Sequence, residues 1–271
     1  MIILFGPNGM LGRYIRIYFE RAGYGVVAID RSILDADSIS AMDVLDKIFE
    51  PYKIDSVNTV VINCVGAIPQ RVNQEKRGMY LRVNTIFPNV LANYCHIFGF
   101  QMYHITTDCV FTGKDGDYTE SSVHDETGIY GLSKSLGESQ QCCNIRTSII
   151  GEEVLNKKSL LEWVRSQNGL TINGFICHYW NGVTCLQLAK ILEHLIRNKI
   201  WWRGVRHFHS PKAVSKYELV KMIIDVYGLQ IELKRSITEL VDKTLGSEYQ
   251  MPLEIPDIRD QIVEQCAFSL D

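Results

Sequence analysis

The sequence predicts an α/β protein built on a doubly wound parallel sheet. Two observations carry this prediction. The 271-residue chain opens with a buried apolar run, Ile2 to Phe5, which leads into a glycine-rich turn and then a helical pattern. Strand and helix signals alternate from there to about residue 150, which indicates parallel strands joined by right-handed crossover helices. Strand, glycine turn and helix in this order are typical of a Rossmann-type fold.

Apolar and β-branched runs place the strands of the first half, and apolar residues three and four positions apart place its helices. Strands are expected at residues 2–5, 25–29, 59–65, 102–108 and 144–147. Helices are expected at residues 10–22, 41–52 and 83–98, and from residue 130 onward.

The alternation is interrupted after Gly151, where the expected elements become shorter. Helices are expected at residues 159–166, 183–198, 215–227 and 258–266, with extended segments at 170–177, 205–209 and 231–233. Ser159 is placed to cap the first of these helices. We expect this half to form a smaller α/β lobe whose segments partly rejoin the main sheet.

Composition and charge exclude several classes of protein. The net charge of −3 gives no electrostatic footprint for nucleic acid, and no apolar run approaches membrane-spanning length. The first residues enter a core strand directly, so we expect no signal peptide and a cytoplasmic location. The eight cysteines are scattered without metal-site spacing, and His207 and His209 lack further ligands, so we expect reduced thiols and no metal.

The glycine turn, Gly6-Pro7-Asn8-Gly9-Met10-Leu11-Gly12, predicts a dinucleotide site. Its glycines allow a tight turn and a close approach to a pyrophosphate, whose charge a helix N-terminus favours. Asp30 is placed to bond a ribose hydroxyl, as in NAD sites, whereas Arg31 is placed to meet the 2′-phosphate of NADP. We favour NADPH and keep NADH as an alternative. Residues 1–150 are therefore expected to form an NAD(P)-binding domain, and residues 151–271 a substrate-binding lobe.

Tyr130 and Lys134 are the candidate proton-transfer pair, because residues four apart on a helix share one face. A neighbouring ammonium favours a phenolate, so we expect Lys134 to lower the pKa of Tyr130. The same spacing recurs at Tyr217 and Lys221, and the pattern alone is therefore weak. Thr107 distinguishes the first pair, because it ends the preceding strand where ligands of open α/β sheets bind.

These motifs resemble the extended short-chain dehydrogenases, and within them the dTDP-4-dehydrorhamnose reductase branch. The resemblance covers roughly residues 1–210. It rests on the glycine turn, Asp30-Arg31, Asn63-Cys64-Val65-Gly66-Ala67, Asn84, the stretch from Thr106 to Gly113, Tyr130-x-x-x-Lys134, Arg146-Thr147-Ser148 and Gly182-Val183-Thr184 with Leu188-Ala189. The chain departs from that branch at Thr106, where Ser is usual, and at Ile149, where bacterial enzymes commonly carry Trp.

The resemblance implies reduction of the C4 ketone of a nucleotide-linked 4-keto-6-deoxy sugar by NAD(P)H. The nucleotide could be dTDP or UDP, and 2-acetamido sugars are included. Tyr130 would protonate the alkoxide, Lys134 would bond the nicotinamide ribose, and Thr107 would bond the carbonyl oxygen. Expected cofactor contacts are Gly6, Asn8, Gly9, Met10, Leu11, Gly12, Asp30, Arg31, Asp35, Cys64, Val65, Gly66, Ala67, Asn84, Thr106, Tyr130 and Lys134. Expected substrate contacts are Arg71, Thr107, Asp108, Val110, Trp180 and Lys243.

Two related activities stay open beside the reductase. A combined epimerase and reductase would need a second acid–base pair, for which Cys109 with His104 or His178 is the candidate set. A regulatory role, as in the β subunit of methionine adenosyltransferase, would keep the fold and NADP binding without catalysis. The expected partner is a sugar nucleotide, and we include a homodimer as a possible assembly.

Overall fold

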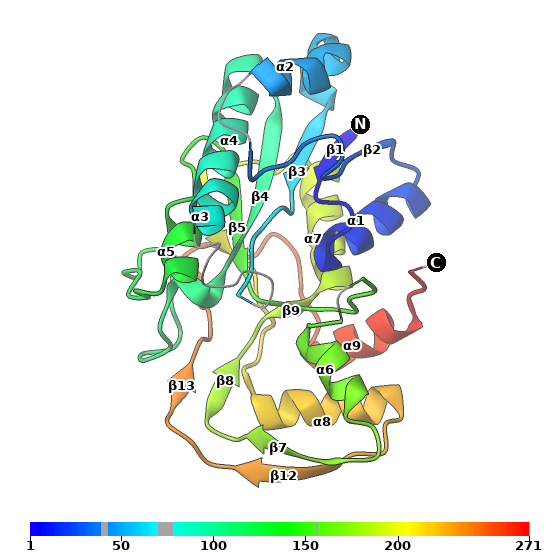
Figure 1. The fold of residues 1–271 in the computed structure, drawn as a ribbon, viewed down its shortest axis with the longest axis vertical. Coiled ribbons are helices and arrows are strands. Elements are labelled where there is room, and N and C mark those ends of the chain that lie inside the picture. Colours follow the sequence, from blue (N-terminus) through cyan, green and yellow to red (C-terminus); the bar gives the residue numbers. More distant parts are fainter. Residues whose placement is uncertain (39–42, 70–77, 156, 271) are drawn as a thin grey trace.

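The computed structural model describes residues 1–38, 43–69, 78–155 and 157–270. Figure 1 shows an elongated molecule with a larger part that holds the central sheet and a smaller part below it. The carboxyl ends of the central strands point toward the smaller part (Figure 1). In an open α/β sheet this is the edge where ligands bind.

The central sheet has six parallel strands in the order β10-β5-β4-β3-β1-β2. They are β1 (Ile2–Phe5), β2 (Val26–Ile29), β3 (Val60–Asn63), β4 (Gln101–Thr107), β5 (Cys143–Thr147) and β10 (Gly204–His207). Strand β1 pairs with β2 on one side and with β3 on the other, so the winding reverses between β1 and β3. The predicted doubly wound α/β fold is confirmed.

Helices cover both faces of this sheet because successive side chains of each strand point to opposite sides. Helices α1 (Met10–Arg21) and α7 (Cys185–Arg197) pack against the face that carries Ile2 and Leu4. Helices α2 (Asp43–Phe49) and α4 (Phe87–Phe98) pack against the face that carries Ile3 and Phe5. Figure 1 shows the two layers on either side of the strands.

The helix expected from Val83 begins earlier and is not regular. Helix α3 (Gly78–Leu81) continues through a π-helical turn, η3 (Arg82–Ile86), into α4. Single π turns are rare in proteins, but those that occur are often found at functional sites. Asn84 lies in this turn, where its amide accepts from the backbone of Ala67 and donates back to it.

The smaller lobe has its own core. Its helices are α6 (Leu160–Ser166), α8 (Lys216–Tyr227) and α9 (Ile258–Ala267), and its strand pairs are β7 (Thr171–Phe175) with β12 (Glu232–Ser236), and β8 (His178–Trp180) with both β11 (Val214–Ser215) and β13 (Val241–Asp242). Ser159 caps α6 as expected, and Ser215 caps α8 through a capping box with Glu218.

The chain crosses between the two parts more than once. Strand β6 (Ile149–Ile150) pairs with β9 (Val183–Thr184), after which α7 and β10 return to the central sheet. Residues on both sides of position 150 therefore build the larger part. The division of the chain at residue 150 into two domains stays a prediction.

Two short turns complete the larger part. The 3₁₀ segment η1 (Glu50–Asn58) follows α2, and η4 (Asp108–Val110) follows β4 and leads toward α5 (Ile129–Ser135).

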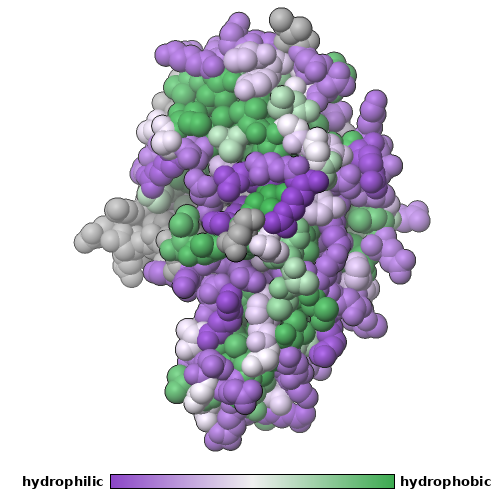
Figure 2. Space-filling model, turned by 90° about the vertical axis from the view of Figure 1, so that its right-hand side faces the viewer, coloured by the Kyte–Doolittle hydropathy of each residue, from purple (hydrophilic) through white to green (hydrophobic). Residues whose placement is uncertain are grey.

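No helix in the described parts of the chain is long and apolar enough to cross a membrane. Figure 2 shows a largely hydrophilic face, with hydrophobic residues visible in patches on both parts.

Candidate active site

The three glycines of the turn after β1 differ in what surrounds them. Gly6 has φ +78°, which side-chain-bearing residues rarely adopt. A Cβ on Gly12 would lie 2.0 Å from the Gly6 carbonyl oxygen, so α1 packs directly on the turn. A Cβ on Gly9 would meet only that oxygen, at 3.5 Å, because Gly9 faces an open side. Helix α1 has no side-chain cap, which leaves its first N–H groups available to an anion.

A cleft of about 390 Å³ opens beside Gly9, at the carboxyl ends of the strands. It is lined by Gly9, Met10, Leu11, Cys64, Val65, Gly66, Ile68, Pro69, Ile105, Thr106, Thr107, Asp108, Cys109, Tyr130, Lys134, Thr147, Ser148 and Ile149. The three predicted catalytic residues therefore share one cleft with the middle of the glycine turn.

The cofactor candidates at the end of β2, Asp30, Arg31 and Asp35, do not line this cleft. Asp30 accepts hydrogen bonds from the backbone and hydroxyl of Ser32, at 2.9 and 2.6 Å, and from Asn8 at 3.4 Å. These bonds, the Ser32 hydroxyl first, lower the pKa of Asp30. Asp30 and Asn8 thus tie the end of β2 to the glycine turn. Arg31 is exposed and forms an ion pair with Asp35 at 2.9 Å.

Lys134 is buried at the base of the cleft, with 6% of its surface exposed. Its Nζ donates to the Ile105 carbonyl at 3.1 Å, and burial lowers its pKa to about 8. A Cβ on Gly66 would lie 3.7 Å from this Nζ, so the glycine leaves the ammonium accessible from the end of β3. Asn84 reaches the same helix through its bond to Ser133 Oγ.

Tyr130 differs from the sequence-based expectation. Burial raises the pKa of Tyr130, the neighbouring Cys109 raises it further, and only the Thr107 hydroxyl acts in the opposite direction to a notable degree. The prediction that the Tyr130 pKa is lowered is wrong for the protein alone, because desolvation of the buried phenol dominates. The phenol therefore carries its proton at neutral pH, as a proton donor requires.

A buried polar network, not anticipated from the sequence, stands behind the cleft. Arg146 is 1% exposed and forms a double hydrogen bond with Glu138, at 3.0 and 2.5 Å. Glu138 also accepts from Thr106 at 2.8 Å. The guanidinium donates to Nε2 of His207 at 2.8 Å and to Nε2 of His124 at 2.6 Å. Both imidazoles must therefore be neutral, with the proton on Nδ1.

That tautomer satisfies the other ring nitrogen of each histidine. Nδ1 of His207 lies 2.7 Å from the Gly246 carbonyl, and Nδ1 of His124 lies 2.6 Å from Ser135 Oγ. His207 therefore has a hydrogen-bond partner on each ring nitrogen. No group of three or more metal-ligating side chains occurs within the described ranges.

Only some of the predicted substrate contacts line the cleft. Thr107 and Asp108 line the cleft, whereas Val110 is wholly buried in a small cluster with Phe111 and does not reach it. Trp180 is also buried, in the smaller lobe. Lys243 directly follows β13, and its backbone N–H donates to the carbonyl of Tyr179. The expectation for Arg71 falls outside the described residues.

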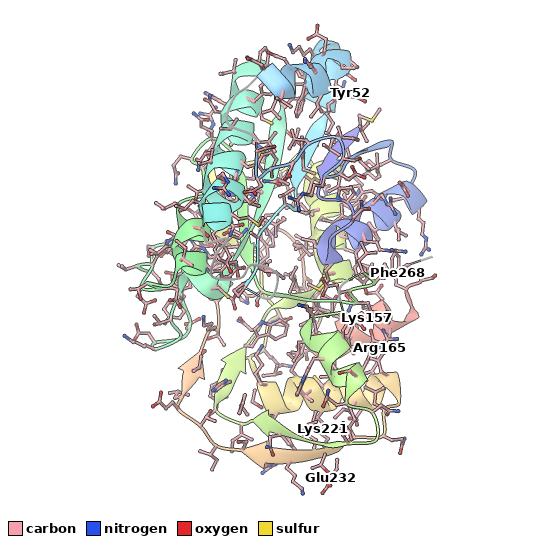
Figure 3. The ribbon with its side chains drawn as sticks, viewed as in Figure 1. Tyr52, Lys157, Arg165, Lys221, Glu232 and Phe268 are labelled. Atoms are coloured by element: carbon pink, nitrogen blue, oxygen red, sulfur yellow. The ribbon has the colours of Figure 1, made fainter. Side chains whose placement is uncertain are left out.

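The duplicate tyrosine–lysine pair lies elsewhere. Tyr217 and Lys221 are on α8, and Figure 3 shows Lys221 in the smaller lobe, away from α5 and the ends of the central strands. The Tyr217 ring is covered by the guanidinium of Arg235, 5.4 Å from the ring centroid. The hydroxyl nearest to Tyr217 in sequence, that of Ser215 at the end of β11, caps α8 by accepting from the backbone N–H of Glu218.

Comparison with known proteins places the chain in a family. The family described as RmlD substrate binding domain matches residues 1–249, so the chain belongs to it. It is 29% identical over 134 residues to a dTDP-4-dehydrorhamnose reductase of Streptomyces griseus, covering 49% of this chain and 42% of that protein. It is 26% identical over 256 residues to a dTDP-4-keto-6-deoxy-D-glucose reductase of Streptomyces niveus, covering 90% and 83%.

Solved structures with a similar fold include a reductase with the same name as one of these relatives. A dTDP-4-dehydrorhamnose reductase from Bacillus anthracis, solved in complex with NADP, superposes with a TM-score of 0.81 over 98% of each chain at 18% identity. A weaker sequence match, 21% identical over 267 residues, is to methionine adenosyltransferase 2 subunit beta of Rattus norvegicus, covering 88% of this chain and 75% of that protein. Proteins named as reductases and a protein named as a subunit are therefore both similar in sequence to this chain.

Proposed function

We propose that the protein is an NADPH-dependent reductase of the C4 ketone of a nucleotide-linked 4-keto-6-deoxy sugar. The observation that carries this proposal is the shared cleft, which brings Thr107, Tyr130 and Lys134 beside the open side of Gly9. Relatives named as 4-keto-sugar reductases support the substrate class. The nucleotide could be dTDP or UDP, and 2-acetamido sugars are included.

The residues of the cleft fit a nicotinamide dinucleotide. Gly9 and the uncapped start of α1 suit the pyrophosphate, and Asp30 stands where a ribose hydroxyl is bound in related sites. Arg31 supports NADPH over NADH, since an exposed guanidinium can pair with a 2′-phosphate. Lys134 keeps N–H groups beyond its bond to Ile105, and we assign one of them to the nicotinamide ribose.

The bound cofactor supplies a hydride to C4 of the sugar. As negative charge develops on the carbonyl oxygen, Tyr130 gives it a proton, and Thr107 holds that oxygen in place through its hydroxyl. The raised pKa of Tyr130 keeps this proton available at neutral pH. We assign to Lys134, which lines the same cleft, the stabilisation of the tyrosinate that results.

The structure gives less support to an epimerase step. Cys109 lines the cleft, but burial raises its thiol pKa to about 12. His104 is buried and held by Asn63 at 3.1 Å, and His178 contacts Thr238 at 2.8 Å in the smaller lobe. Neither imidazole lines the cleft beside Cys109. We also propose a cytoplasmic location, as suits an enzyme that uses NADPH and sugar nucleotides.

The test is incubation with NADPH and a panel of dTDP-, UDP- and GDP-linked 4-keto-6-deoxy sugars, including 2-acetamido forms. We expect NADPH to be consumed with at least one dTDP- or UDP-linked sugar, and the product to lack the ketone. Tight NADPH binding without turnover of any sugar would contradict the reductase. It would favour the regulatory reading, as in the methionine adenosyltransferase subunit that the chain resembles.

A further inference from the structure

Two lysines leave the small sheet of the lower lobe on either side of its middle strand. Strand β8 pairs with β11, where Ser215 lies opposite Tyr179, and with β13, where Asp242 lies opposite the same tyrosine. Lys216 directly follows β11, and Lys243 directly follows β13. The pairing of β11 and β13 with β8 therefore places Lys216 and Lys243, which are 27 residues apart in the chain, on either side of one strand.

The ammonium of Lys216 is placed by a buried aromatic ring. Its Nζ lies 5.2 Å from the ring centroid of Trp180, which is 2% exposed. Burial lowers the pKa of Lys216, and the nearby Asp108 and Cys109 oppose that effect. These two residues line the cleft. Lys216 therefore stands just beyond the cleft, on the side of the smaller lobe, with Lys243 close enough to act on the same ammonium.

Neither ammonium forms a direct ion pair with a carboxylate in the parts of the chain that the structure describes. Other lysines meet carboxylates directly: Lys53 with Asp46 and Glu50, Lys190 with Glu264, and Lys212 with Asp257. Lys216 and Lys243 have no such contact within 4.0 Å across residues 1–38, 43–69, 78–155 and 157–270. The Asp108 carboxylate nearby is occupied by the Thr107 hydroxyl and the Cys109 thiol.

Desolvating the ammonium of Lys216 without an acceptor is costly, and a second, half-buried lysine beside it adds positive charge, so this arrangement favours an anionic ligand. We propose that Lys216 and Lys243 bind the diphosphate of the sugar nucleotide, an inference that rests on the proposed function. If C4 of the sugar lies at Tyr130 and Thr107, the diphosphate, which is attached at the far side of the sugar ring, extends past Asp108 and Cys109. Phosphate oxygens form charge-assisted hydrogen bonds with lysine, which holds them as a point charge.

The arrangement also explains why Trp180 is buried under a lysine. The ring does not line the cleft, and it faces the ammonium of Lys216. In this account Trp180 acts through Lys216, as a positioning residue, and does not touch the sugar.

The site is tested by calorimetric titration of dTDP, UDP and inorganic pyrophosphate into the full chain with NADPH present. Lys216→Met and Lys243→Met keep the apolar stems and remove the charges. Lys221→Met is the matched control, because Lys221 is an exposed lysine on the same helix, α8. We expect each cleft-side variant to bind the tightest of the three probes about tenfold more weakly, the effect of losing one charge-assisted hydrogen bond. Lys221→Met should bind it as wild type does.

Lys216→Arg separates charge from packing. It should recover most of the affinity that Lys216→Met loses, and thermal unfolding of each variant checks that the fold is kept. Equal binding of the probes to wild type and both methionine variants overturns the proposal, as does wild type that binds none of the three. A carboxylate on the sugar would offer the lysines the same chemistry, but it would leave binding of these sugar-free probes unchanged.

Failure of the site and failure of the proposed function give different results. Keto-sugar reduction with an unchanged KM in Lys216→Met would remove the diphosphate site and keep the reductase. Probe binding that depends on Lys216, in a protein that reduces no keto sugar, would keep the site and remove the reductase.

Discussion

At the scale of single residues, two glycines of the turn have different roles: Gly12 allows α1 to pack on the turn, and Gly9 leaves room for a ligand. Gly9→Val should abolish NADPH binding while the fold survives, since a Cβ there meets only one atom, at 3.5 Å. Calorimetry and thermal unfolding measure the two effects. Gly12→Ala is the contrasting variant, because its Cβ would overlap the Gly6 carbonyl and should lower the melting temperature. Unchanged NADPH affinity in Gly9→Val would remove the glycine turn from the cofactor site.

Arg31 decides the cofactor preference in this account. Its side chain is 72% exposed, and among the described residues its ion-pair partner is Asp35, so a 2′-phosphate can displace that carboxylate or bind the guanidinium beside it. Arg31→Ala should weaken NADPH binding by about tenfold and leave NADH binding nearly unchanged. Titrations with both cofactors give the answer, and equal losses for the two would refute a role for Arg31 at the 2′-phosphate.

At the scale of elements, Arg146 joins three neighbouring strands and the loop before α5. It lies on β5, its carboxylate partner also holds Thr106 of β4, and His207 belongs to β10. Such a network is stable only while the histidines accept its hydrogen bonds. Burial, with the charge of Arg146 as second cause, lowers the pKa of His207 to about 4, and the pKa of His124 is lowered for the same reasons.

The sign of the pH dependence follows from this shift. Between pH 6.5 and about 4 the unfolded chain binds a proton at His207 that the folded protein does not, so stability falls as the pH falls through that range. His207→Gln keeps an acceptor for Arg146 and removes the titration. Its free energy of unfolding should fall less steeply from pH 7 to pH 5 than that of wild type, by up to about 1.4 kcal/mol per pH unit.

Denaturant unfolding at several pH values measures these slopes. His96→Gln, at an exposed histidine on α4, controls for the loss of an imidazole as such. Parallel pH profiles for wild type and His207→Gln would show that His207 does not carry the acid sensitivity.

The predictable elements are those whose signal is local. The strand Ile2–Phe5 and the helix Cys185–Arg197 follow from an apolar run and an apolar stripe, and both are found. The π turn at Arg82–Ile86 is missed because side-chain periodicity indicates a helix and not the extra residue within one turn. Helix α3 before it begins five residues earlier than predicted, for its first turn has no apolar stripe of its own.

The residues of the site also divide into those that a sequence pattern predicts and those that it does not. Thr107, Tyr130 and Lys134 are predictable as a group because the carboxyl ends of parallel strands meet at one edge. The Arg146 network is not predictable, since its partners are 8 to 61 positions away and nothing in a pattern marks a buried guanidinium. The direction of the Tyr130 pKa is missed for a related reason, because spacing reports a neighbour and not the depth of burial.

At the scale of the whole molecule, we propose a homodimer formed through α5 and the turn beside it. Ile86, Leu132 and Leu136 are exposed, Leu136 by 60%, and Asn89 ties the two helices by donating to the Leu136 carbonyl. Adjacent exposed apolar side chains of this kind favour association. Leu136→Glu should convert the dimer to a monomer in light scattering, while Ile237→Glu, at an exposed residue of the smaller lobe, should not. A wild-type monomer would contradict the proposal.

We propose Tyr130 as the proton donor when the cleft reduces a keto sugar. Tyr130→Phe keeps the ring and removes the proton, so NADPH affinity should stay and kcat should fall by roughly 10²–10⁴-fold. Tyr217→Phe is the matched control, since it has the same lysine spacing without the Thr107 strand end, and it should retain near-normal turnover. The most direct measurement is the turnover of these two variants beside wild type, on the sugar that wild type reduces. A large loss confined to Tyr130→Phe is the predicted result, and a damaging Tyr217→Phe, or no loss in either variant, would contradict the account.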